Sequence, residues 1–169
     1  MKASSFSIFI PIIFLFILSC SKGKYDHIFG KEYRSLTEFP EFANMDRGGG
    51  ALIGEKENVN YVINYYRKDT VNLIAFEEIS RKVKGQSRFK LLDVLEIYNL
   101  EENQQITFGE CRMKQNTDKE IIAIYEDVDT TEVQFYKNIV QAWRANQTTR
   151  KIEPIEIADI DCVNKVFGL

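Results

Sequence analysis

The sequence lacks three features that would mark common classes of protein. It has one histidine, His27, among 169 residues, which argues against histidine zinc sites and against catalysis that needs a histidine deep in the domain. It has 22 Lys and Arg against 25 Asp and Glu, so we do not expect a protein that binds nucleic acid. Its apolar run from Phe6 to Leu18 is 13 residues long and is broken by Ser7 and Pro11. A helix that spans a membrane needs about 20 apolar residues, so this run does not predict a permanent span.

Motifs for cofactors and metals are also missing. Residues 48–50 are three glycines, but the Lys-Ser/Thr pair of a phosphate-binding loop does not follow them. The carboxylates of residues 127–132 lack the glycine and the distant glutamate of a calcium loop. The neighbouring acids Glu77 and Glu78 would point to opposite faces of a strand and could not act together on one substrate. We therefore expect no metal, no cofactor and a protein that is not an enzyme.

The N-terminus has the pattern of an export signal. Lys2 supplies the positive start, and the apolar run from Phe6 to Leu18 supplies the hydrophobic region. The run ends in Ile17-Leu18-Ser19-Cys20, which resembles the lipobox of bacterial lipoprotein signal peptides. The resemblance implies that residues 1–19 are removed and that Cys20 becomes the lipid-modified N-terminus. The alternative is an ordinary secretory signal that happens to be followed by a cysteine.

Acylation of Cys20 would attach the protein to a membrane without spanning it. The thiol is the nucleophile that can carry a diacylglycerol group, and two or three acyl chains anchor a protein stably. Ser21 follows the cysteine, and this resembles the sorting signal of outer-membrane lipoproteins that face the periplasm. We expect an acylated N-terminus and tether over residues 20–30, then a single domain over residues 31–169.

Two cysteines remain after Cys20 is assigned to the anchor. Cys111 and Cys162 form the only possible pair within the chain, and a compartment outside the cytoplasm permits disulfides. We expect a Cys111–Cys162 bond. Two buried reduced thiols, or a redox pair, are the alternatives, although the Cys-x-x-Cys spacing that lowers a thiol pKa is lacking.

Hydrophobic patterning predicts strands first and then one helix. The β-branched and aromatic runs that predict strands are 61–66, 71–76, 89–97, 106–111 and 120–125. Residues 130–146 place apolar side chains at helical spacing, with Asp129 and Glu132 as a capping box. Residues 151–157 predict a last strand. We expect it at a sheet edge, because Pro154 cannot donate a backbone hydrogen bond to a neighbouring strand. The expected fold class is α+β: a mostly antiparallel β-sheet of about five or six strands packed by one amphipathic helix near 130–146.

One segment concentrates positive charge. Residues 81–90 contain five cations and no acid. We consider this segment a candidate loop for an anionic partner such as lipid, glycan or an acidic protein; the alternative is a solvated loop that protects an edge strand. The five residues are Arg81, Lys82, Lys84, Arg88 and Lys90.

The sequence therefore predicts the cellular location of the protein more clearly than its biochemical function. We expect a lipid-anchored lipoprotein of the cell envelope that contacts the membrane through the acyl chains on Cys20 and binds an envelope protein or glycan. Two alternatives are a hydrolase of envelope polysaccharide or peptide, and an inhibitor or immunity protein directed against a toxin. A hydrolase would need converging carboxylates in a cleft.

Overall fold

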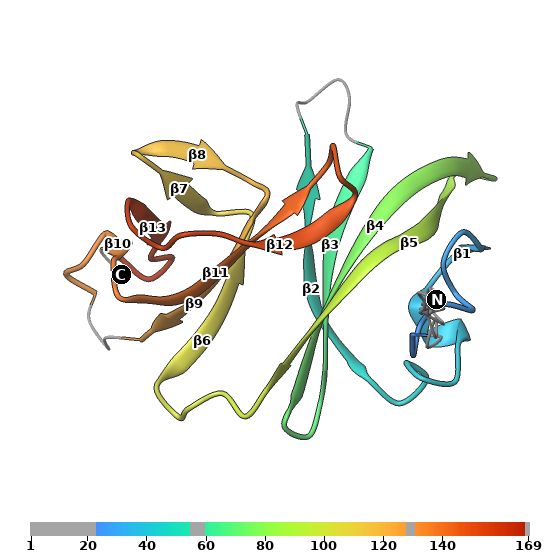
Figure 1. Ribbon diagram of the computed structural model, residues 1–169, viewed down its shortest axis with the longest axis horizontal. Helices are drawn as coiled ribbons and strands as arrows, with labels where there is room; N and C mark the ends of the chain where they lie inside the picture. The colour runs from blue at the N-terminus through green and yellow to red at the C-terminus, as the bar shows by residue number, and fades with distance from the viewer. Residues whose placement is uncertain (1–22, 55–59, 128–130, 168–169) are drawn as a thin grey trace, which may run out of the picture.

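The computed structural model describes residues 23–54, 60–127 and 131–167. Over these ranges the chain forms thirteen β-strands in three antiparallel sheets (Figure 1). The described residues contain no α-helix and one short 3-10 helix, η1 (Leu36–Glu38). No helix in the described part of the chain is long and apolar enough to cross a membrane.

We name the sheets A, B and C. Sheet A has the order β1-β5-β4-β3-β2, formed by β1 (Glu32–Tyr33), β2 (Asp46–Ile53), β3 (Tyr61–Lys68), β4 (Val71–Val83) and β5 (Gln86–Tyr98). Sheet B has the order β12-β11-β9-β6, formed by β6 (Gln104–Phe108), β9 (Ile121–Glu126), β11 (Ile139–Asn146) and β12 (Lys151–Pro154). Sheet C has the order β10-β13-β7-β8, formed by β7 (Cys111–Met113), β8 (Asn116–Asp118), β10 (Phe135–Tyr136) and β13 (Ile160–Val163).

The hairpin of β3 and β4 confirms the strands predicted for residues 61–66 and 71–76. Its register runs from Tyr61 opposite Glu78 to Lys68 opposite Val71. Asp69 has a φ of 52°, a conformation that aspartate tolerates better than most residues. The β-branched and aromatic residues of both strands therefore pair across the sheet as their spacing indicates.

Sheet A is buried on both faces. On one face, Ile28, Leu36 and Phe42 of the N-terminal segment form a cluster with Leu73 and Leu91 of the sheet. On the other face, a second cluster joins sheet A to sheet B; its fully or nearly fully buried members include Ile63, Ile74, Phe76, Ile122 and Ile124. Burial on both faces explains why β4 reads as an almost continuous apolar run near residues 73–76.

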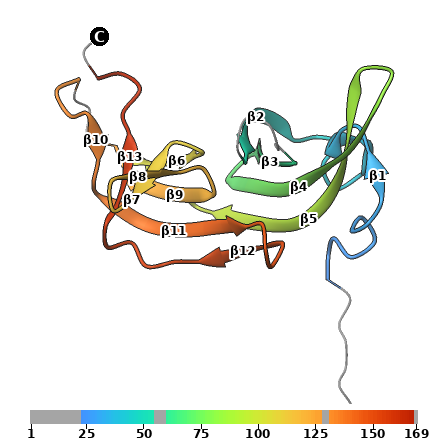
Figure 2. The ribbon, with the colours of Figure 1, turned by 90° about the horizontal axis from the view of Figure 1, so that it is seen from above.

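Sheet B is the middle layer of the molecule. Ile122 and Ile124 on β9 face sheet A, whereas Ile121 and Ala123 belong to a third cluster together with Cys111 of sheet C. Alternate side chains of one strand thus enter two different cores, as the twofold period of a strand requires. Figure 2 shows sheet A and the N-terminal segment at one end of the molecule and sheet C at the other.

The prediction of an α+β fold with a helix near 130–146 is wrong. The described part of this segment forms β10 and β11. The apolar face expected for the helix consists of Val133, Tyr136, Ile139, Val140 and Trp143. In β11, Ile139 belongs to the core between sheets B and C, Trp143 packs against the core between sheets A and B, and Val140 is exposed, with an irregularity between residues 139 and 141. Two cores and a bulge therefore produced the spacing that we attributed to a helix.

Residues 23–30, in the expected tether, pack against the body. Ile28 is fully buried, and the ring of Tyr25 lies 5.3 Å from that of Phe42. The predicted signal peptide and Cys20 lie outside the described residues, as does Asp129 of the predicted capping box.

Candidate functional site

The predicted disulfide bond is present. Cys111 on β7 and Cys162 on β13 are directly opposite in register, and their Cα atoms are 3.9 Å apart. Both cysteines are fully buried in the core between sheets B and C. The bond closes a sequence separation of 51 residues and joins β7 to β13, two neighbouring strands of sheet C.

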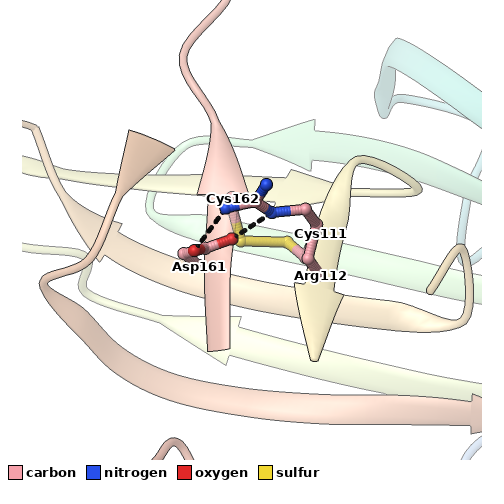
Figure 3. The surroundings of a disulfide bond; sticks show 4 residues. All are labelled: Cys111, Arg112, Asp161 and Cys162. Atoms are coloured by element: carbon pink, nitrogen blue, oxygen red, sulfur yellow. Dashed lines mark hydrogen bonds and ion pairs between the residues drawn. A yellow bond between two sulfur atoms is a disulfide. The ribbon is translucent and has the colours of Figure 1, made fainter. Parts of the chain in front are cut away.

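A salt bridge lies beside the disulfide. The guanidinium of Arg112 donates through Nε and Nη2 to the two carboxylate oxygens of Asp161, each at 2.7 Å (Figure 3). The same guanidinium lies 3.4 Å from the ring centroid of Phe135, within cation–π range. The hydrogen bond with Asp161 raises the pKa of Arg112 above its ordinary value. β10, β13 and β7 are therefore joined by side chains as well as by backbone bonds.

The structure places the five predicted basic residues on one hairpin, although strands rather than a long loop carry them. β4 and β5 continue to a two-residue turn at Lys84 and Gly85, whose φ values are both positive, as tight hairpin turns require. Arg81 lies directly opposite Arg88. We call the stretch from Arg81 to Lys90 the basic hairpin.

The burial of Glu77 was not predicted from the sequence, where this residue was considered only as one of a pair of neighbouring acids. Glu77 is 1% exposed and accepts hydrogen bonds from the Tyr33 hydroxyl at 2.6 Å and from Asn64 Nδ2. Burial raises the pKa of Glu77, and the two hydrogen bonds and the charge of Arg47 oppose this shift only in part. Glu78 points the other way and pairs with Arg150 at 2.8 Å, as expected for neighbours on a strand. Glu77 links strands β1, β3 and β4 and is closed off from solvent.

A second carboxylate fixes the start of the described chain. Glu96 on β5 accepts hydrogen bonds from Lys24 Nζ at 2.5 Å and from the hydroxyls of Tyr25 and Tyr98. Burial raises the pKa of Tyr25 to about 12, and the bond to Glu96 adds to the effect. The hydrogen bond to Glu96 likewise raises the pKa of Lys24. These contacts attach the N-terminal segment to the end of β5 that is distant from the basic hairpin.

The surface carries a groove of about 540 Å³ beside the edge strand β6. Its floor includes the stacked rings of Tyr125 and Tyr136, whose centroids are 4.2 Å apart. Asp127 and Lys165 lie on its lining. Among the described residues, no group of three or more His, Cys, Asp or Glu side chains has an arrangement that could hold a metal ion.

Comparisons with models of known protein families, with curated proteins and with solved structures find no match to this chain. The candidate sites are therefore described by their geometry alone. They are a structural disulfide, a basic hairpin, two buried or half-buried carboxylates and a groove.

Proposed function

We propose that this chain is a lipid-anchored lipoprotein of the bacterial cell envelope and that its β-structured body is a binding module without catalytic activity. The observation that carries the proposal is the buried Cys111–Cys162 bond. Structural disulfides form and persist in oxidising compartments outside the cytoplasm. Such a bond supports the export that the N-terminal sequence predicts, and export places the chain where Cys20 can be acylated.

The structure suggests how closely the anchor would hold the body. Cys20 precedes Gly23 by three residues, which span at most about 11 Å. Lys24 and Tyr25, which follow immediately, are bound to Glu96. An acyl group on Cys20 would therefore hold sheet A next to the membrane surface rather than on a long tether. Ser21 favours the outer membrane and its periplasmic face as the location.

Binding of an envelope partner is favoured over hydrolysis by the position of the acidic residues. Glu77 has the raised pKa of a general acid, but it is enclosed beneath the N-terminal segment, where a substrate cannot reach it. The groove beside β6 is open to partners. An envelope protein or glycan fits this groove, since its lining combines aromatic, amide and charged groups.

Metabolic labelling with a palmitate analogue tests the anchor. The wild-type chain expressed in a Gram-negative host should incorporate the label and remain with the membranes, and its mature N-terminus should be acylated Cys20 by mass spectrometry. Cys20→Ala should abolish labelling and release the protein from the membrane fraction, whereas Ser21→Ala, the matched neighbour, should retain the label. An unlabelled wild-type protein, or one with residues 1–19 still attached, would refute the proposal.

A further inference from the structure

The basic hairpin carries positive charge that its surroundings do not balance. Arg81 is 65% exposed in its side chain and pairs with Glu32 at 2.6 Å, and the nearby Glu78 is paired with Arg150. Lys82 and Lys84 are exposed at the tip, and no described carboxylate lies within ion-pair distance of either. The hairpin is thus a cationic projection on a chain whose formal net charge is −3.

Two of these cations are forced together by the strand register. Arg81 and Arg88 are cross-strand partners, so their side chains leave the same face of the hairpin at neighbouring positions. Like charges directly opposite each other destabilise a strand pair. The ion pair of Arg81 with Glu32 offsets part of this repulsion. An anion bound at Arg88, next to Arg81, would relieve the rest, and guanidinium groups match the geometry of phosphate oxygens.

The hairpin and the start of the described chain lie toward the same end of the molecule. Figures 1 and 2 both place them at the end opposite sheet C, and Figure 2 shows them on opposite sides of that end. Lys24 is bound to Glu96, eight residues along β5 from Arg88, which corresponds to about 26 Å of strand. A membrane that holds Cys20 can therefore also meet the hairpin when β5 lies along its surface.

We propose that the basic hairpin is a second membrane contact, which binds the phosphate head groups of anionic lipids and sets the orientation of the acylated body. This inference rests on the proposed acylation of Cys20. The anchor keeps the hairpin at a high local concentration of head groups, and basic residues near an anionic surface are attracted to it. The narrow hairpin offers little apolar area, which favours a charged surface over a protein partner. Sheet C and its disulfide would then face away from the membrane.

Lysine modification on vesicles tests this orientation. The acylated protein is incorporated into phosphatidylcholine vesicles that either contain or lack phosphatidylglycerol. The vesicles are then treated with a membrane-impermeant amine-reactive ester. Mass spectrometry quantifies the modification of each lysine. Phosphatidylglycerol should slow modification of Lys82 and Lys84 severalfold, while Lys114 and Lys137, on or beside sheet C, should react at unchanged rates. The protection should disappear at about 1 M salt, where the Debye length is about 3 Å.

Variants identify the groups that bind. Arg81→Gln/Arg88→Gln leaves the reporter lysines in place and should weaken the contact about 30-fold, because each cation near an anionic surface is worth about a factor of five in partitioning. Lys114→Gln/Lys137→Gln, which removes two cations elsewhere, should leave the protection intact. Equal rates on both kinds of wild-type vesicle, or protection by polygalacturonate but not by phosphatidylglycerol, would overturn the inference. A protein that does not enter vesicles at all would instead refute the acylation.

Discussion

The ring of Tyr65 lies directly over Gly48. A Cβ atom added to Gly48 would be 2.4 Å from Cδ1 of this ring, a distance that two carbon atoms do not tolerate without bonding. Gly48 falls at the irregularity of β2, between Arg47 and Gly49, and the Tyr65 hydroxyl donates a 2.5 Å hydrogen bond to Asn72. The three glycines of residues 48–50 lie inside β2, and the missing side chain of Gly48 makes room for the tyrosine.

Gly48→Ala should therefore lower the free energy of unfolding by about 1–3 kcal/mol, the usual cost of overpacking. The added methyl group displaces the Tyr65 ring and weakens its bond to Asn72. Denaturant unfolding measures the loss. In a Tyr65→Ala background the same substitution should cost little; an equal loss in both backgrounds would show that the ring is not responsible.

The disulfide bond should contribute about 4 kcal/mol to stability in the chain-entropy model, because it closes a loop of about 50 residues. Cys111→Ala/Cys162→Ala should lose this amount in denaturant unfolding. Wild-type protein unfolded in the presence of reductant should approach the stability of the variant. The native wild-type domain should show no free thiol at Cys111 or Cys162 without reductant, and two reactive thiols would contradict the bond.

Burial of Glu77 should make stability depend on pH. Burial raises the folded-state pKa of Glu77 above its ordinary value of 4.5, so the folded state holds the proton more tightly than the unfolded state. The resulting stabilisation is complete below pH 4.5 and is lost as the pH rises through the folded-state pKa.

Glu77→Gln, which cannot titrate, should remove this dependence. Urea unfolding between about pH 4 and pH 8 should show that the wild-type protein gains stability relative to Glu77→Gln as the pH falls. Glu78→Gln, a substitution of the partly exposed neighbour, should follow the wild-type profile. A constant difference between wild type and Glu77→Gln would mean that the pKa of Glu77 is the same in the folded and unfolded states, which would contradict the prediction.

Local patterns predicted several strands correctly. The β-branched and aromatic runs at residues 61–66, 71–76 and 89–97 identify β3, β4 and β5, because the pairing partners of these strands are near in sequence. Pro154 correctly predicted that β12 is an edge strand, since proline cannot donate to a neighbouring strand. The pairing of Cys111 with Cys162 followed from the lack of any other partner once Cys20 was assigned to the anchor.

The sequence by itself determined the strands with near neighbours, the choice of disulfide partners and the concentration of cations at residues 81–90. Only the tertiary structure decided that residues 139–146 form a strand, because their apolar spacing reflects two separate cores rather than one helix face. It also decided that Glu77 is enclosed and that Arg81 meets Arg88. These outcomes depend on how three sheets stack and on strand register, and neither is encoded in the local spacing of residues.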